Sequence, residues 1–407
     1  MDKTLNKSLP IWQLALYFLM IGFTFISVPK SSSIYVLYAR AVQTFELMFF
    51  ILLLFENFKR GLRLNKFNIL TNSWWFCYTT ITYLFTLTMV GLTPMFKWMN
   101  VMIFLLLGTC YWRENLQGSM KYLAIVFSFL IYLNAILLII FPDGLWIDEE
   151  WVGRGDPTRY LFGNYNQIGF VCLLGIIIQS IYTFLSKKGS VNLICLFSVS
   201  IASVLFVGSM TSTVGLIILA TCILMRNTLA RFSKTIVTIC LMVNLLFFLF
   251  IVWYGNSIES VDLATRFIEN TLSKDTSFSN RTDIWANAIY KIKQGSWIGF
   301  GVQNVDWNDT YLGGSGPHNF WLMLLLQGGY VLCFSFIYIL INVIRQALNT
   351  INAATYSTLM GLCVLFVMSQ LEAYNLVQVF LILQLVYYAS IVNEELERMP
   401  NEEVAIP

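Results

Sequence analysis

The sequence predicts an all-α membrane protein, a polytopic helical bundle of about twelve transmembrane helices with a large external loop between spans nine and ten. Three observations predict this fold. Of the 407 residues, 57% are hydrophobic and only 12% are charged, whereas soluble domains carry roughly 25% charged residues. The apolar residues gather in runs long enough to cross a bilayer. The basic residues between these runs gather on alternate sides, as in membrane proteins of fixed orientation.

The apolar runs give the spans in order. A membrane helix needs about 20 mostly apolar residues, and irregular backbone cannot face lipid. The twelve predicted spans cover residues 11–28, 34–55, 74–90, 95–111, 121–141, 164–185, 191–208, 213–225, 235–254, 318–342, 355–371 and 373–392. The eighth run is short and the last two are nearly continuous, so eleven spans is the alternative count.

The distribution of Lys and Arg predicts the orientation. With the N-terminus inside, the short inner loops hold most of the basic residues, and the short outer loops hold only Lys30, Lys97, Arg154 and Arg159. Since cytoplasmic loops carry the basic excess, we expect both termini to be cytoplasmic. The first apolar run has no small-residue cleavage site, so we interpret it as a signal anchor. All eight cysteines fall within spans, which speaks against a disulfide framework.

These spans and loops divide the chain into four parts. Residues 1–254 form a membrane domain of nine spans that includes an external loop at 142–163. Residues 255–317 form the large external loop. Residues 318–392 hold the last three spans, and residues 393–407 form an acidic cytoplasmic tail. Since long loops are usually functional or disordered, we look for the site in the two external loops.

The large loop contains a predicted amphipathic helix over residues 281–294. Its apolar face consists of Ile284, Trp285, Ala288, Ile289 and Ile292. Asn280 is the predicted N-cap and Gly295 the predicted stop. Arg281 then lies in the first turn, where free backbone N–H groups already favour anions, so it is a candidate phosphate ligand. The alternative is an exposed arginine paired with Asp283 or another acid of the loop.

His318 is the only histidine of the chain. It lies between the glycine-rich segment 313–316 and the tenth span, at the outer interface, where a general acid or base can meet a substrate from outside. Neighbouring arginines would lower the pKa of His318 and keep it neutral at pH 7. An interfacial histidine without a catalytic role is the alternative.

Charges inside spans are candidate functional groups. Arg40 and Glu46 lie six residues apart in the second span and so face different sides of a helix. Arg40 is nearer the outer side, where it can either enter an outward-facing cavity or extend to the interface. Glu372 lies at the outer turn between the last two spans, and the simplest interpretation is a cap of that turn.

Two sets of residues together resemble the family of O-antigen ligases and repeat-unit polymerases, which are polytopic membrane glycosyltransferases. One set is Arg281-x-x-x-Trp285-x-x-Ala288, Gly299-x-Gly301, His318-Asn319 and Gly328-Gly329. The other is Arg159-x-x-x-Gly163-Asn164-x-Asn166. The topology is similar over most of the chain, whereas the motifs cover only residues 159–166 and 281–329.

The resemblance implies a substrate and roles. The substrate is an oligosaccharide linked to polyprenyl (undecaprenyl) diphosphate, transferred to a glycan hydroxyl at the outer face of a bacterial cytoplasmic membrane. Arg281 and Arg159 would bind the diphosphate, and His318 would act as base or orient the acceptor. The remaining predicted substrate contacts are Arg154, Arg40, Asn164 and Asn319. A flippase and a chain-length regulator are the implied protein partners.

One departure from the family pattern concerns the outer turn Ser209-Met210-Thr211-Ser212, where many members carry a Ser-Arg pair. An arginine role at this turn is therefore not transferred to this chain. Arg40, Arg154 and Arg266 are the candidates to replace it. The outer loops contain no DxD pattern, and Asp306 and Asp309 are three residues apart, so we expect catalysis without a metal or other cofactor.

Several alternatives remain. We favour a polymerase, because polymerases are the more numerous and variable group and this chain matches the family loosely, while a ligase would use the same donor chemistry. A flippase or secondary transporter also fits twelve spans, although we find no internal repeat. Transferases of the oligosaccharyl type have paired acids in the first outer loop, unlike residues 29–33. Cell-wall glycan polymerases would use a loop aspartate such as Asp283 or Asp306.

Overall fold

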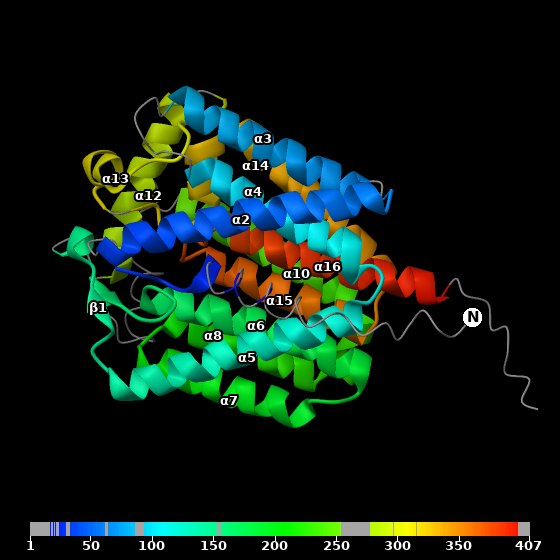
Figure 1. The fold of residues 1–407 in the computed structure, drawn as a ribbon. Helices are drawn as coiled ribbons and strands as arrows, with labels where there is room; N and C mark the ends of the chain where they lie inside the picture. Colours follow the sequence, from blue (N-terminus) through cyan, green and yellow to red (C-terminus); the bar gives the residue numbers. More distant parts are fainter. Residues whose placement is uncertain are drawn as a thin grey trace, which may run out of the picture.

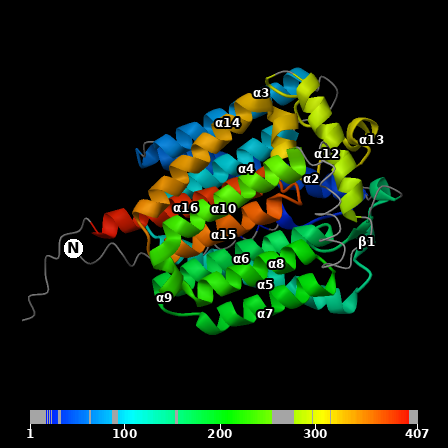
Figure 2. The same cartoon turned by 180° about the vertical axis from the view of Figure 1, so that it is seen from behind.

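The computed structural model describes residues 17, 19, 21, 24–29, 33–61, 64–85, 93–152, 156–253, 277–295, 297–314 and 316–397. These residues form a bundle of long helices that run side by side, with only one short hairpin of strands (Figures 1 and 2). The predicted all-α class is therefore confirmed.

The bundle is assembled from the following elements. The first part contains α2 (Ser33–Lys59), α3 (Lys66–Phe85), α4 (Thr93–Leu107) with the π-helix η1 (Gly108–Trp112), α5 (Leu116–Ile140), α6 (Tyr165–Ser186), α7 (Ser190–Phe206), α8 (Met210–Leu224) and α9 (Arg226–Leu229). The second part contains η3 (Ala230–Phe232), α10 (Ser233–Phe247) with the π-helix η4 (Phe248–Trp253), α12 (Ser277–Gln294), α13 (Val305–Leu312), α14 (Phe320–Asn349), α15 (Ala353–Ser369) and α16 (Leu376–Glu397).

Six helical stretches of the described chain are long and apolar enough to cross a membrane. They are Leu37–Lys59, Pro94–Trp112, Leu116–Ile140, Tyr165–Ser186, Arg226–Trp253 and Phe320–Asn349. Shorter apolar helices cover Ser190–Phe206, Met210–Leu224, Ala353–Ser369 and Leu376–Ile391. From the second onward, each predicted span overlaps a helix, and the first falls mostly on residues outside those described. The helices support a membrane protein, while the count of twelve spans and the orientation stay predictions.

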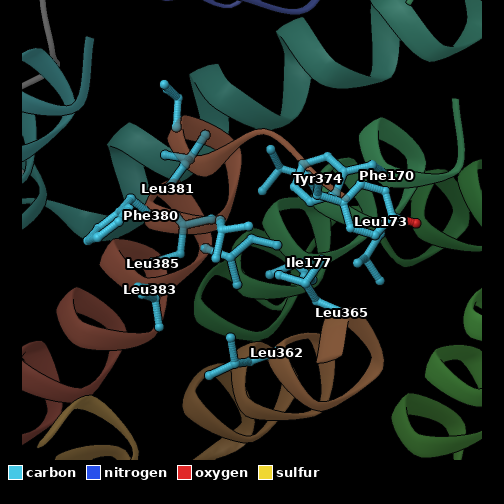
Figure 3. Packing of buried hydrophobic residues seen from close by; sticks show 14 of the residues in the cluster. Phe170, Leu173, Ile177, Leu362, Leu365, Tyr374, Phe380, Leu381, Leu383 and Leu385 are labelled. Carbon is cyan, nitrogen blue, oxygen red and sulfur yellow. The ribbon is translucent and has the colours of Figure 1, made fainter. Parts of the chain in front are cut away.

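The core of the bundle lies where α6, α15 and α16 meet. These helices bury residues on all sides, which fits their nearly uninterrupted apolar sequences. Figure 3 shows the packing of Phe170 and Ile177 of α6, Leu365 of α15 and Phe380 of α16. The core also includes Tyr374, just before α16, whose ring lies 5.1 Å from that of Phe170.

The two external segments lie at the same end of the bundle, opposite α9 and the end of α16 (Figures 1 and 2). In segment 142–163, β1 (Trp146–Ile147) pairs antiparallel with β2 (Thr158–Arg159), and the 3-10 helix η2 (Glu149–Trp151) lies between them. The large loop contributes α12 and α13. The prediction of a helix starting at Arg281 with Asn280 as N-cap is wrong, because α12 is already helical at Ser277. Arg281 therefore lies beyond the first turn.

The apolar face of α12 is confirmed, and it packs on α14. Trp285 and Ala288 are buried, as are Ile284, Ile289 and Ile292. The segment that follows α12 binds to a break in α14. The backbone N–H groups of Phe300 and Gly301 donate to the carbonyls of Leu326 and Gln327 over 2.8 and 2.9 Å. The loop motif Gly299-x-Gly301 and the helix motif Gly328-Gly329 are thus two sides of one contact.

Candidate functional site

His318 lies just before α14 with a left-handed backbone, φ +44°. A residue with a Cβ adopts this conformation only when its surroundings hold it there. Two bonds do so. On one side the indole N–H of Trp285, on α12, donates to the carbonyl of Pro317 over 3.0 Å. On the other side Asn319 caps α14, since its Oδ1 accepts from the Leu322 N–H over 3.0 Å. The residues on both sides of His318 are therefore fixed, Pro317 to α12 and Asn319 to α14.

Arg281 extends from α12 to the loop between α15 and α16. Its guanidinium donates from Nη1 to the Leu371 carbonyl over 2.7 Å and from Nη2 to Glu372 Oε1 over 2.9 Å. The ion pair with Glu372 is largely buried. The alternative pairing with Asp283 considered from the sequence is not the one observed. A guanidinium has five N–H groups, and these two bonds use two of them.

The charge of Arg281 acts on His318. Burial first and the neighbouring Arg281 guanidinium second lower the pKa of His318 from its usual value of 6.5 to about 4. The imidazole is therefore neutral at pH 7 and can accept a proton or a hydrogen bond. This agrees with the expectation that an arginine beside His318 keeps it uncharged.

Glu372 belongs to the site, although its position in the sequence predicts only a cap of the turn between the last two spans. The structure pairs it with Arg281. Burial raises the pKa of the Glu372 carboxyl, and Arg281 opposes that rise. Nearby, burial and Glu372 raise the pKa of Tyr374 well above its usual value. An acidic residue in a short turn between two apolar runs was the available signal, because it rarely stays there without a partner.

Arg159 is held within its own loop. Its Nε donates to Asp148 Oδ2 over 3.2 Å, and its Nη1 donates to the carbonyls of Asp156 and Thr158. The guanidinium also lies 5.1 Å from the ring centre of Trp151. Only 6% of Arg159 is exposed. These contacts stabilise the β1–β2 hairpin, and a role in binding diphosphate stays a prediction.

The other predicted contacts lie in different settings. Arg40 is exposed on α2. Asn164 caps α6, because its Oδ1 accepts from the Gln167 N–H over 3.1 Å. Asn319 is fully buried, and both the oxygen and the nitrogen of its side-chain amide form hydrogen bonds with other protein groups. Arg154 lies outside the described residues. The structure thus brings together Arg281, His318 and Asn319 among the predicted set.

The turn at Ser209, where related chains often carry an arginine, is a small buried hydroxyl cluster. The Ser209 hydroxyl donates to Asn166 Oδ1 over 3.0 Å and lies 2.8 Å from the Ser212 hydroxyl. Gly169 of α6 lies so close that an added Cβ would come within 2.0 Å of Ser212 Oγ. An arginine in place of Ser212 would not fit this packing without rearrangement. Met210 in the same turn is exposed, so the packing alone does not account for the departure from the family pattern.

The low pKa of His318 leads to a prediction about stability. Because the folded pKa of about 4 lies below the unfolded value near 6.5, the unfolded chain takes up a proton first as the pH falls. The folded protein should therefore lose about 2 kcal/mol between pH 7 and pH 5 through this group. Thermal unfolding of purified protein at both pH values should show a larger loss for the wild type than for His318→Gln. Equal losses of stability in the two proteins would contradict this prediction. Glu372, another buried titratable group of the site, is present in both proteins and cannot cause a difference between them.

The comparison with known families fits this geometry. Residues 194–337 match the O-antigen ligase family. The matched segment runs from α7 into α14 and includes Arg281, His318 and the two paired glycine motifs, whereas Arg159 and Glu372 lie outside it. No curated protein matches the chain. The relationship to the O-antigen ligase family predicted from the motifs is therefore confirmed.

Proposed function

We propose that this protein is a membrane glycosyltransferase that polymerises oligosaccharide repeat units carried on polyprenyl (undecaprenyl) diphosphate. The match to the O-antigen ligase family indicates an enzyme of the ligase and polymerase type that acts on lipid-linked glycans. The observation that supports the proposal most is that Arg281 and the residue after His318 bind the same short segment, Gln370–Glu372, at one end of an apolar bundle. In this arrangement Arg281 helps to lower the pKa of His318, which is therefore neutral. Such an end lies at the boundary between lipid and water, where a lipid-linked sugar diphosphate is accessible.

The chemistry divides between the two side chains. The oxygen of the acceptor hydroxyl attacks the anomeric carbon, and the bond from that carbon to the diphosphate breaks with inversion. The diphosphate leaves with the bonding electron pair, which a guanidinium stabilises best because it stays charged and binds phosphate oxygens. The hydroxyl proton passes to His318, which is neutral and therefore able to accept it. Arg281 keeps N–H groups beyond the two that bind the α15–α16 loop.

The proposed setting is the outer face of a bacterial cytoplasmic membrane, with both termini inside. The excess of basic residues in the loops opposite the two external segments supports this orientation. A flippase that delivers the carrier-linked units and a chain-length regulator are the proposed protein partners. We propose that Arg159 in the neighbouring hairpin also contacts the donor, after exchange of one of its present bonds.

The proposal is tested with purified protein in lipid nanodiscs and carrier-linked repeat units. A ladder of longer carrier-linked chains, formed without any other acceptor, is the result expected of a polymerase. A product that appears only when a lipid acceptor is added indicates a ligase instead. Movement of the carrier-linked unit across vesicles without any new glycosidic bond indicates a flippase and overturns the proposed reaction.

Transfer is expected to continue at an unchanged rate in the presence of EDTA. Among the described residues, His, Cys, Asp and Glu side chains form no group of three or more that could hold a metal ion. The measurement is the initial rate with EDTA, with EDTA plus excess Mg²⁺, and without either. A rate that falls on chelation and returns with the divalent ion contradicts this prediction.

A further inference from the structure

A buried chain of amide side chains begins at the residue after His318 and joins three helices. The Asn319 amide, at the start of α14, donates to the carbonyl of Gln370 at the end of α15 over 2.8 Å. The Gln370 amide donates to Asn244 Oδ1 on α10 over 3.0 Å. The Asn244 amide in turn donates to the carbonyl of Cys240 over 2.8 Å. The conformation beside His318 is therefore connected to α15 and α10.

Burial of this chain makes its bonds difficult to exchange. Asn319 is 0% exposed, Gln370 is 4% exposed and Asn244 is 6% exposed. Amides removed from water cost free energy unless they are hydrogen-bonded, so these groups stay paired with one another. Helix capping alone needs only the Oδ1 of Asn319, and the Nδ2 bond to Gln370 is additional.

The same short segment also receives Arg281. The Gln370 carbonyl accepts from Asn319, the next carbonyl, that of Leu371, accepts from Arg281, and Glu372 completes the ion pair. Arg281 comes from α12, whereas His318 precedes α14. The segment Gln370–Glu372 is thus the common support on which both candidate catalytic residues are held.

We propose that Asn319 and Gln370 are positioning residues, which set the placement of the His318 imidazole relative to the Arg281 guanidinium. The inference rests on the proposed function. It gives Asn319 a role different from the substrate contact predicted from the sequence, since its amide is fully used inside the protein. Small displacements of a reacting group lower rates strongly, by as much as 10²-fold for about 1 Å.

The test separates helix capping from positioning. Asn319→Asp keeps an oxygen that can cap α14 but replaces the donor with an oxygen that faces the Gln370 carbonyl. We expect kcat to fall by roughly 10- to 100-fold while KM for the carrier-linked donor changes less than about threefold. Gln370→Met, which keeps the length but loses the bond to Asn244, is expected to lower kcat by a smaller factor. The matched control is Asn352→Asp at the N-cap of α15, where Oδ1 accepts from the Thr355 N–H. It should retain wild-type kcat.

A second readout does not depend on activity. Because the chain contains one histidine, protein labelled at histidine and purified with a histidine-free tag gives a single imidazole signal by NMR. Asn319→Asp should split, broaden or shift that signal at pH 7, and Asn352→Asp should leave it unchanged. Loss of kcat without any change of the His318 signal, or no loss at all, overturns the positioning role. If the wild-type protein transfers no glycan, the proposed function is overturned. If Asn319→Asp nevertheless changes the His318 signal, the inference that Asn319 positions His318 still stands.

Discussion

Replacing His318 with alanine is expected to lower the rate of glycosyl transfer by about 10²- to 10⁴-fold, the usual contribution of a positioned acid or base. The imidazole is neutral, lies beside Arg281 and is held in a left-handed conformation by its neighbours. Alanine removes the proton acceptor but keeps both hydrogen bonds of the flanking residues, from the Trp285 indole to the Pro317 carbonyl and from the Leu322 N–H to Asn319 Oδ1. The measurement is single-turnover transfer from the carrier-linked donor in nanodiscs.

Two further variants separate the possible roles of His318. His318→Gln can orient a hydroxyl but cannot take its proton, so it should remain as slow as His318→Ala if the imidazole is the base. Recovery of most of the rate in His318→Gln would assign an orienting role instead. The control is Asn304→Ala, which removes the cap of α13 in the same external region. A His318→Ala protein that is folded and retains more than a tenth of the wild-type rate contradicts the catalytic assignment.

Donor binding should change the proton affinity of His318. A base works best when its pKa is near the working pH, and a pKa of about 4 is low for that purpose. Arg281 is one cause of the low value. A diphosphate bound to Arg281 brings negative charge beside the imidazole and so raises the pKa of His318. The imidazole would then become a stronger base when the donor is in place.

The sequence predicted the helices well because their physical cause is local. A run of about 20 apolar residues has few alternatives to a helix in lipid, and the runs at 164–185 and 355–371 coincide with α6 and α15 within two residues at each end. The spacing of apolar residues also predicted the buried face of α12. It did not predict where α12 begins, because Asn280, the expected N-cap, lies inside a helix that starts at Ser277.

The partners of the site residues could not be predicted from the sequence. Arg281 and Glu372 are 91 positions apart and meet only after α12 and the α15–α16 loop have packed together. The sequence offered Asp283 as the ion-pair partner of Arg281 instead, because spacing along the chain identifies only partners that are close in sequence. The family resemblance implies that Arg159 binds the diphosphate, and only the fold shows that Asp148 and two backbone carbonyls already accept hydrogen bonds from it.

Gly329→Ala is expected to destabilise the folded protein by roughly 2–6 kcal/mol, the sum of backbone strain and overpacking. Gly329 interrupts α14 with φ +61° and ψ −166°, a conformation that is essentially confined to glycine. A Cβ there would come within 2.2 Å of the Trp297 carbonyl oxygen and 2.5 Å of the Gly299 nitrogen. Both neighbours are backbone atoms and cannot rotate away. Since domains are stable by only about 5–15 kcal/mol, the loss should be visible as a lower melting temperature.

The matched control for this change is Gly61→Ala. Gly61 also has a positive φ of 59°, but no atom of the described residues lies within 4 Å of the Cβ position, so strain alone should cost about 1–2 kcal/mol. Melting is followed by the loss of the monodisperse protein peak after heating in detergent. A Gly329→Ala protein as stable as Gly61→Ala would show that the contact of segment 297–301 with α14 is loose. Because that contact connects the end of α12 to α14, it also fixes the helices that carry Arg281 and follow His318, and its loss should lower transfer even at temperatures where the bundle remains folded.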